Sequence, residues 1–301
     1  MVAELEGCAK TAPIGAPGPY MGMTIYDALV LAEVARLLPR KARVLTLGVP
    51  ALNFSAQMYT AEQARRRAAP GSVSSFATAA EFFRSLGFAD VDALDISDYE
   101  GANILGDLND PDLVHKIGKR YDLVYDSGTI EHIFDIAGAL RTIHALVDTG
   151  GAVVHATPTN GFTDHGFWQV SPDLFRAAYG SSGYRLLTST VFVFGLRPYA
   201  LPAEENFYRS QGRSFVMANL PEAIAVFAAQ KMQETPMTNV RLQEYYGVIH
   251  DGKQQASEYA FFLPFGSAAM GRAARGTVMR RLLLAGDALR GRLRALVRGG
   301  R

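Results

Sequence analysis

The sequence predicts an α/β fold in which a mostly parallel sheet of seven strands carries helices on both faces. Short apolar segments that end in glycine or an acid alternate with longer segments whose apolar residues recur every three or four positions. This alternation is typical of βαβ units. The chain has 301 residues, of which 49% are hydrophobic and 20% are charged. Such a chain can bury a large core, and this composition excludes a disordered chain or a fibre.

The first helix is expected from Thr24 to Leu38. Thr24 is a suitable N-cap, Asp27 makes the first turn acidic, and Pro39 ends the helix. Before it, residues 1–20 are rich in proline and glycine and hold neither a helix nor a central strand.

Seven later segments have the composition of buried strands. They are 43–48, 91–96, 102–107 (the weakest), 121–126, 152–157, 184–195 and 223–231. Helices are expected between them over 79–86, 129–147 and 171–179. The second helix is expected to end at Gly150-Gly151, and Ser171-Pro172 is expected to open the third. In such a sheet, ligands bind beyond the carboxyl ends of the strands.

We divide the chain into a leader with the first helix (1–39), a central α/β domain (40–235) and a C-terminal extension (236–301). Two insertions are expected in the central domain, at about 51–78 and 196–221. Residues 271–301 hold nine arginines and one acid around an apolar stripe of helical spacing, which predicts a basic amphipathic helix. That helix is a candidate contact for a membrane surface or a protein partner, with packing on the chain's own acidic body as the alternative.

Composition also bounds the compartment and the partners. The net charge is +1 and the basic residues gather at one end, so no nucleic-acid partner is predicted. The only cysteine, Cys8, cannot form an internal disulfide. The leader lacks the apolar run of a signal peptide, and no segment resembles a membrane span, so a cytoplasmic location is expected. No histidine pair has metal-ligand spacing with a third ligand nearby, and no metal site is predicted.

Polar residues and turns stand where the predicted parallel strands end, and such positions converge on one cleft. An acid after the second strand suits the two hydroxyls of a ribose, because a carboxylate accepts two hydrogen bonds. An acid after the third strand can accept from an adenine amino group. The candidate cofactor-binding residues are Thr46, Gly48, Asp95, Ile96, Asp107, Leu108, Asp126 and Ser127.

One stretch resembles a known family. It reads Tyr121-Asp-Leu-Val-Tyr-Asp-Ser-Gly-Thr-Ile-Glu-His-Ile-Phe-Asp and is followed by a predicted helix and by Thr149-Gly-Gly-Ala-Val-Val-His. It is similar to the fourth-motif strand, Glu-His element and Gly-Gly turn of the class I S-adenosylmethionine-dependent methyltransferases, over roughly residues 40–231. Within that superfamily, the segments Asp95-Ile-Ser-Asp-Tyr-Glu-Gly-Ala-Asn and Asn160-Gly-Phe-Thr-Asp-His-Gly-Phe resemble those of methyltransferase-like proteins of bacterial glycan and natural-product gene clusters.

The resemblance implies a Rossmann-like methyltransferase fold and S-adenosylmethionine as the cofactor. It also implies methyl transfer to oxygen or nitrogen of a small molecule or sugar derivative, in secondary metabolism or glycan biosynthesis. Asp126 would lie where the methyl group meets its acceptor. Its alternative role is a helix N-cap.

The first motif departs from the family. Thr46 stands in place of its acid, and of the three glycines in Gly-x-Gly-x-Gly only Gly48 remains, followed by Pro50 and Leu52. Proline fixes φ and removes a donor. Two other functions therefore stay open: cofactor-free chemistry on the same fold, such as a ring closure or an elimination, and a non-catalytic partner subunit.

Catalytic candidates are Asp126, His132 and His165. His165, beside Asp164, suits a general base that deprotonates a hydroxyl or an amine, whereas His132 has packing against the sheet as its alternative. The only role considered for Glu131 is a favourable interaction with the positive N-terminal end of a helix dipole. The loop after the fifth long strand places aromatic faces beside polar groups, which suits a sugar or a ring. The candidate substrate-binding residues are Asn160, Asp164, Phe167, Trp168 and Gln169.

Overall fold

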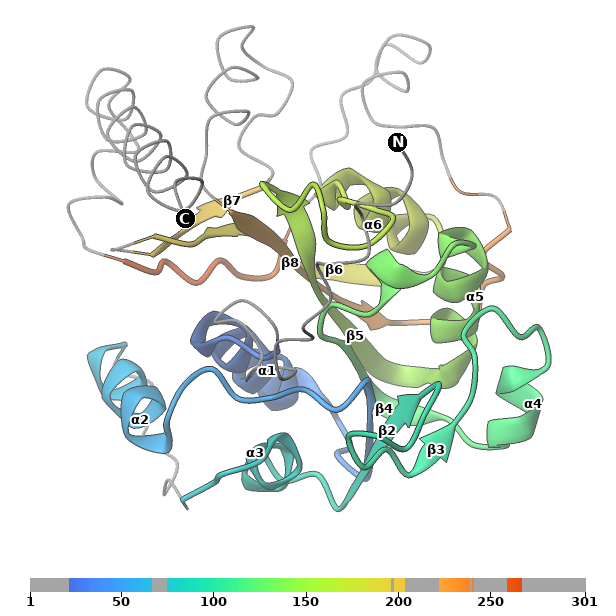
Figure 1. The fold of residues 1–301 in the computed structure, drawn as a ribbon, viewed down its shortest axis with the longest axis horizontal. Helices are drawn as coiled ribbons and strands as arrows, with labels where there is room; N and C mark the ends of the chain where they lie inside the picture. Colours follow the sequence, from blue (N-terminus) through green and yellow to red (C-terminus); the bar gives the residue numbers. More distant parts are fainter. Residues whose placement is uncertain are drawn as a thin grey trace, which may run out of the picture.

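The computed structural model describes residues 22–66, 75–195, 198–203, 222–238, 240 and 259–266. These residues form an eight-stranded sheet with the order β3-β2-β1-β4-β5-β8-β6-β7, flanked by helices on both faces (Figure 1). The strands are β1 Arg43–Leu47, β2 Asp90–Asp95, β3 Ile104–Leu105, β4 Tyr121–Asp126, β5 Val147–Asn160, β6 Tyr184–Val193, β7 Tyr199–Pro202 and β8 Ala223–Lys231. The helices are α1 Ile25–Leu37, α2 Ala56–Arg65, α3 Ala79–Ser85, α4 Leu113–Ile117, α5 Ile136–Leu146 and α6 Pro172–Gly180, with a 3-10 turn, η1, at Ile130–His132.

The sheet confirms the predicted fold class. Strands β3, β2, β1, β4 and β5 pair in parallel, whereas β8 is antiparallel to both β5 and β6. The strand that the sequence did not predict is β7, which pairs with β6 at the edge of the sheet. It lies in the expected insertion at 196–221, most of which falls outside the described residues.

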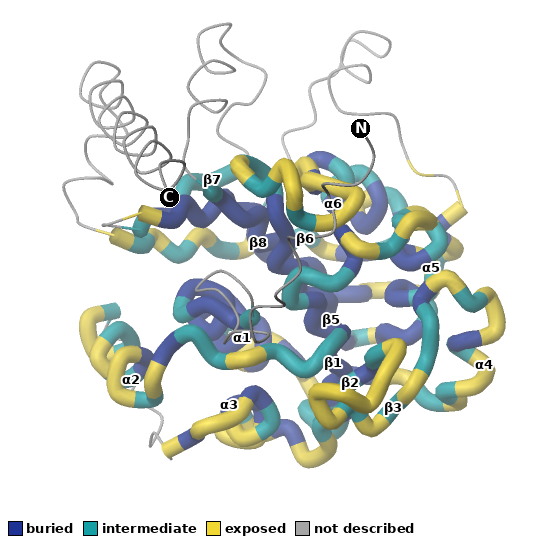
Figure 2. The backbone as a smooth tube through the Cα atoms, in the orientation of Figure 1, coloured by how far each residue is buried: buried dark blue, intermediate teal, exposed yellow. Residues whose placement is uncertain are grey.

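Two apolar cores lie on opposite faces of the sheet, because successive side chains of a strand point to opposite faces. One face packs against α1, α2 and α3, and the other packs against α4, α5 and α6. The first core takes Val44, Leu123, Tyr125 and Val154 from the central strands, and the second takes Leu45, Leu47, Val124 and Val153. Figure 2 shows the resulting buried centre, with exposed residues on the outer helices and loops.

Helix α1 begins as the sequence predicts. The backbone N–H of Asp27 donates to Thr24 Oγ1, and the N–H of Thr24 donates to Asp27 Oδ2 at 2.8 Å, which forms a reciprocal capping box. The helix packs within the first core, where the hydroxyl of Tyr26 donates to the carbonyl of Leu263. Residues from all three predicted regions thus meet in one core, and the predicted domain boundaries stay a prediction.

The predicted helix over 129–147 is wrong in its first turn and in its ending. Residues 130–132 form only the η1 turn, and α5 begins at Ile136, where the Asp135 carboxylate caps it by accepting from the N–H of Gly138. The helix ends at Leu146, and Gly150-Gly151 lies inside β5, at an irregularity in its pairing with β4. Other elements match more closely: Ser171 caps α6, with Pro172 in its first turn.

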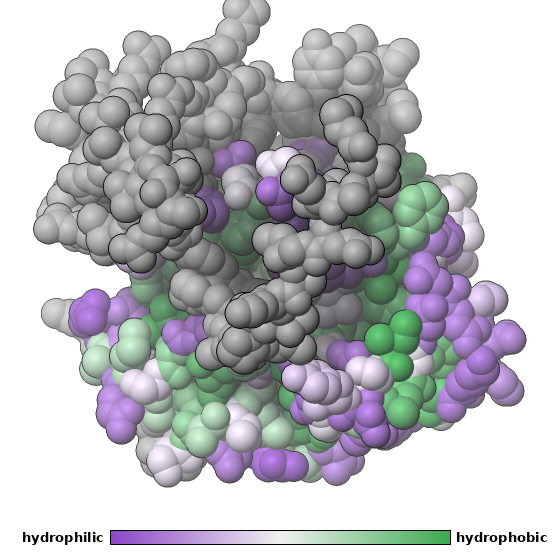
Figure 3. Space-filling view, viewed as in Figure 1, coloured by the Kyte–Doolittle hydropathy of each residue, from purple (hydrophilic) through white to green (hydrophobic). Residues whose placement is uncertain are grey.

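The described surface leaves the predicted contact with a membrane or a protein partner untested. In Figure 3 hydrophilic side chains gather over α4, where Lys116 forms an ion pair with Asp110. Among the described residues no helix is both long and apolar enough to cross a membrane. The predicted basic helix at 271–301 lies outside the described residues. Its contact with a membrane or partner, and the cytoplasmic location, stay predictions.

The buried Asp27 is expected to make stability depend on pH. Burial raises the pKa of Asp27 to about 7. The folded chain then holds a proton that the unfolded chain releases near pH 4, so stability falls as pH rises from about 4 to about 7. Asp27→Asn keeps an acceptor for the N–H of Thr24 and removes this titration.

We expect the stability of Asp27→Asn relative to the parent protein to increase by about 2–3 kcal/mol between pH 5 and pH 8, measured by urea unfolding. Parallel curves for the two proteins across that range would contradict the assignment.

Candidate functional site

The site lies where the sheet order reverses. The chain runs from β1 outward to β2 and β3 and then returns to β4 on the other side of β1, and ligands bind at such a switch point. Leu47 of β1 pairs with Asp126 of β4, and the hydroxyl of Thr129 donates to the Leu47 carbonyl at 2.9 Å. Gly48 follows with φ +74°, a conformation that favours glycine. The loops after β1 and β4 therefore lie against each other.

The structure brings Gly48 and Asp95 together, as expected of a nucleoside site. A Cβ placed on Gly48 would lie 3.8 Å from Asp95 Oδ2 and 3.4 Å from Thr129 Oγ1, so the missing side chain leaves room at this turn. Asp95 is half-buried. Its Oδ1 accepts from the N–H of Ser97, and its Oδ2 has no hydrogen bond within the described chain. One carboxylate oxygen is thus available to a ligand.

The other candidates near β2 and β3 differ in accessibility. Asp107 is half-buried, and its Oδ1 accepts from both the backbone and the side chain of Asn109. Leu108 is buried, whereas the side chain of Ile96 is 75% exposed. The backbone N–H of Gly106 donates to the Asp95 carbonyl, which holds the two loops side by side. Asp95 and Asp107 therefore lie on adjacent loops at the carboxyl ends of β2 and β3.

The altered first motif has a structural explanation. The buried hydroxyl of Thr46 donates to the Gly48 carbonyl at 2.7 Å, so it stabilises the turn. Beyond Pro50 the loop is tied to the segment before α1. The N–H of Met23 donates to the Ala51 carbonyl and the N–H of Asn53 donates to the Met23 carbonyl. The loop after β1 is thus fixed by the N-terminal segment.

Asp126 is fully buried at the end of β4. Its Oδ1 accepts from the N–H groups of Thr129 and Ile130, so Asp126 holds the η1 turn and not, as the alternative from the sequence had it, the start of an α-helix. Its Oδ2 lies 2.7 Å from Nδ1 of His155, and Nε2 of that ring lies 2.7 Å from the Tyr179 hydroxyl. Because the carboxylate can only accept, Nδ1 carries the proton, and the Tyr179 hydroxyl donates to Nε2. The neighbouring Ser127 is half-buried, and its Oγ accepts a hydrogen bond from the Tyr125 hydroxyl.

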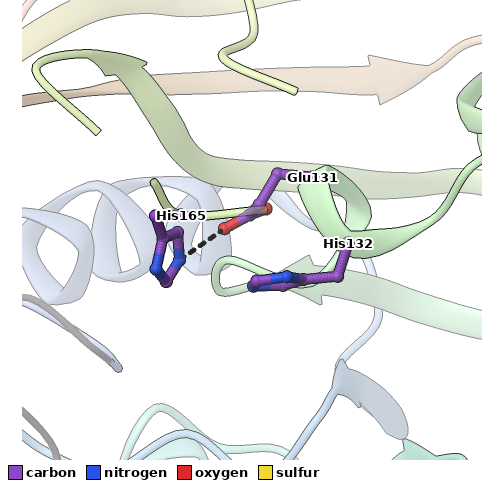
Figure 4. A group of neighbouring side chains, drawn as sticks. All are labelled: Glu131, His132 and His165. Carbon is purple, nitrogen blue, oxygen red and sulfur yellow. Dashed lines mark ion pairs between the residues drawn. The ribbon is translucent and has the colours of Figure 1, made fainter. Parts of the chain in front are cut away.

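A second group of polar side chains follows directly. Glu131 is fully buried, and neither of its carboxylate oxygens has a hydrogen-bond partner among the described residues. Its Oε1 lies 3.6 Å from Nε2 of His165, and one ligand atom from each of Glu131, His132 and His165 falls within 4.8 Å of the others. Figure 4 shows the carboxylate of Glu131 beside both imidazole rings, with His132 and Glu131 on the same turn. We refer to these three residues as the Glu-His-His cluster.

All three groups of this cluster have shifted pKa values. Burial raises the pKa of Glu131 to about 7. The adjacent Glu131 carboxylate raises the pKa of His165, whereas burial, with a contribution from His165, lowers the pKa of His132. Titratable groups with opposing shifts in one place are typical of functional sites.

Two glycines give Glu131 its place. Gly128 and Gly166 both have positive φ, and a Cβ on either would come within 3.0 Å of an atom of Glu131. The Glu131 carbonyl accepts from the N–H groups of Phe167 and Trp168, at 2.8 and 3.2 Å. The loop after β5 is thus clamped onto the η1 turn, and His165 comes to face Glu131.

The substrate-binding candidates surround this clamp. The indole of Trp168 donates to the Ile133 carbonyl, and the exposed ring of Phe167 meets Phe134 edge to face at 6.0 Å. Gln169 accepts from the N–H of Phe162. Asp164 is exposed, and Asn160 is half-buried at the end of β5. Sequence reasoning missed Glu131 and Phe134; the adjacency of Glu131 to His132 was the one available signal for the carboxylate.

A family model and several solved structures are similar to this chain. Residues 29–190 match the family model described as a methyltransferase domain. No curated protein matches. Similar solved structures include TehB from Haemophilus influenzae (12% identity, covering 68% of this chain and 62% of that one, TM-score 0.37). A TehB-like SAM-dependent methyltransferase from Corynebacterium glutamicum has 17% identity, coverage of 68% and 86%, and a TM-score of 0.34. Phosphoethanolamine N-methyltransferase 2 from Haemonchus contortus, in complex with S-adenosyl-L-methionine, has 15% identity, coverage of 67% and 52%, and a TM-score of 0.33.

Gly166→Ala is expected to loosen the clamp. At φ +74° an alanine is strained, and its Cβ would lie 2.9 Å from the Glu131 carbonyl oxygen. Gly101→Ala is the matched control, because Gly101 has φ +87° with nothing within 4 Å of the added atom. We expect losses of about 2–3 kcal/mol for Gly166→Ala and about 1 kcal/mol for Gly101→Ala in urea unfolding. Equal losses would show that the contact with Glu131 is unimportant.

Proposed function

The chain belongs to the methyltransferase-domain family, and on that premise we propose that it transfers a methyl group from S-adenosylmethionine to oxygen or nitrogen of a small molecule or sugar derivative. One observation carries the proposal: the Gly48–Asp95 turn and the Glu-His-His cluster are joined by the short turn after β4. The hydroxyl of Thr129 in that turn donates to the carbonyl of Leu47, next to Gly48, and a Cβ added to Gly128 in the same turn would lie 3.0 Å from Oε1 of Glu131. A nucleoside-binding edge and an acid-base group thus lie on neighbouring loops.

The residues of the cleft fit the cofactor at several points. Gly48 has no side chain to block the approach of a ligand to the backbone, and the available Oδ2 of Asp95 can accept from a ribose hydroxyl. Asp107 and the backbone of Leu108 are assigned to the adenine ring. The amino-acid end is assigned to the backbone of the β1 turn and to Ser127, because the hydroxyl of Thr46 is engaged within that turn. When bound, the cofactor supplies an electrophilic methyl group on a sulfonium sulfur.

Asp126 serves this reaction as a positioning residue. Its carboxylate is buried and holds the N–H groups of Thr129 and Ile130, and so it fixes the turn that carries Glu131 and His132. A charged carboxylate with three hydrogen-bond donors is stable without contact with a ligand.

The Glu-His-His cluster activates the acceptor. His165 is only half-buried, and its imidazole can accept the proton of an acceptor hydroxyl or amine, while Glu131 stabilises the imidazolium that forms. The acceptor atom would take the methyl group from the sulfonium sulfur, which leaves as a neutral thioether, and His165 would hold the acceptor's proton until water removes it. The aromatic faces of Phe167 and Trp168, with Asn160, Asp164 and Gln169, are proposed to hold the acceptor. A role in secondary metabolism or glycan biosynthesis belongs to the same proposal.

Titration calorimetry with S-adenosylmethionine and S-adenosylhomocysteine tests the cofactor site. We expect binding that Asp95→Asn weakens about 10- to 100-fold, because a charged acceptor for a ribose hydroxyl is lost. Asp98→Asn is the matched control: it removes an exposed charge from the same loop and should change the affinity less than twofold. No heat and no thermal shift at millimolar ligand would overturn the proposal and favour cofactor-free chemistry or a partner subunit.

The acceptor side is tested by turnover. Sugar nucleotides with free hydroxyl or amino groups are incubated with S-adenosylmethionine labelled in its methyl group, and transfer of the label is measured. We expect His165→Asn to lower kcat about 10²- to 10⁴-fold and to leave the calorimetric Kd of the cofactor unchanged. His115→Asn, on the exposed surface of α4, is the control. Loss of cofactor affinity in His165→Asn would instead place His165 on the cofactor side.

A further inference from the structure

The Glu-His-His cluster has the composition of a metal site. Two imidazoles and one carboxylate form a common donor set for zinc and for other divalent transition metals. The sequence did not predict it, because Glu131 and His132 are adjacent and His165 comes from a distant loop. The fold brings one ligand atom of each to within 4.8 Å of the others.

Glu131 supplies a second, independent observation. Its side chain is fully buried, yet neither oxygen has a hydrogen-bond partner among the described residues. The 3.6 Å from Oε1 to His165 Nε2 is too long for a hydrogen bond. A buried carboxylate that has no hydrogen bond and only the long ion-pair contact with His165 is costly, and a bound cation offsets that cost directly.

We infer that Glu131, His132 and His165 bind one divalent transition-metal ion of the zinc class. An ion about 2.0–2.2 Å from each ligand holds neighbouring ligand atoms roughly 3.0–3.6 Å apart. The Glu131–His165 pair already has this separation. The side chain of His132 is exposed and can close the remaining gap by rotation. The backbone need not move, because hydrogen bonds to the Glu131 carbonyl already hold the loop after β5, which carries His165, against the turn that carries Glu131 and His132.

Three ligands from the chain leave at least one coordination position open, as in catalytic rather than structural zinc sites. The exposure of His132 places that position toward solvent. If the proposed methyl transfer holds, on which this step rests, the open position would take the acceptor oxygen and lower the pKa of its hydroxyl. The acceptor class would then be one with a hydroxyl group able to bind a metal. In the metal-bound state His165 would be a ligand and not the base; the ion would lower the pKa of the bound hydroxyl, and its proton would pass to water.

Metal binding is tested on the full-length, untagged protein after dialysis against a chelator, without cofactor or acceptor. Cobalt(II) chloride is added while visible absorption is recorded, and zinc chloride is titrated in a calorimeter. We expect one ion per chain, with a d–d absorption band between about 500 and 650 nm that reports nitrogen and oxygen ligands at low coordination number. Glu131→Gln and His165→Asn are each expected to weaken binding at least about 100-fold and to remove the band.

Two controls separate this site from other donors. His115→Asn and Cys8→Ser should leave the stoichiometry, the affinity and the band unchanged. His132→Asn, on the exposed ligand, gives a third cluster variant that should fold even if substitution of the buried Glu131 does not. Absence of a band and of heat at millimolar metal would overturn the inference, as would full binding by all the cluster variants.

The outcome is independent of the cofactor test. Cofactor affinity measured in the presence of a chelator reports the proposed methyl transfer, whereas cobalt absorption without cofactor reports the metal. Either result can therefore fail alone.

Discussion

The site depends on a single buried carboxylate, that of Asp126. One of its oxygens accepts hydrogen bonds from the backbone of the turn after β4. The other is hydrogen-bonded to the imidazole of His155, and the opposite nitrogen of that ring is hydrogen-bonded to the Tyr179 hydroxyl. These bonds connect the end of β4 to β5 and to α6. They also set the direction in which Glu131 leaves the turn, toward the interior. A buried carboxylate is tolerated when hydrogen-bond donors surround it. Two of the donors to Asp126 are N–H groups of the turn after β4, so the same bonds hold that turn in place.

Much of the fold follows from local sequence signals. Thr24 and Ser171 cap helices because their hydroxyls accept from N–H groups within the first turn, and each predicted apolar strand segment overlaps a strand that forms, although β5 extends beyond its segment at both ends. The predicted helix over 129–147 was wrong in its first turn because two capping aspartates lie within ten residues of each other. Asp126 and Asp135 each hold a separate turn, so the apolar spacing from Thr129 to Val147 concealed a break before α5. The edge strand β7 has only four residues and no alternation from which to predict it.

The site residues that could be predicted are those whose position depends on sheet topology alone. Gly48, Asp95 and Asp107 follow parallel strands, and such strand ends must converge. Burial and pairing were not predictable. That Thr46 bonds within its own turn depends on a positive φ at Gly48. That His165 meets Glu131 depends on a clamp formed by backbone groups, which carry no sequence signal. Spacing rules therefore excluded a cluster that the tertiary fold assembles.

A purely structural role does not explain Glu131. A glutamate that only filled space would be replaced without loss by glutamine or an apolar residue, since neither carboxylate oxygen has a donor among the described residues. Glycine stands at positions 128 and 166, both with positive φ: a Cβ on Gly128 would lie 3.0 Å from Oε1 of Glu131, and a Cβ on Gly166 would lie 2.9 Å from its backbone carbonyl oxygen. Glycine costs conformational entropy on folding, and a buried carboxylate costs desolvation energy. These costs fall on one short turn and the loop clamped to it, beside the switch point of the sheet. A buried carboxylate without a hydrogen bond at this position is accounted for by a positively charged group that Glu131 holds during function.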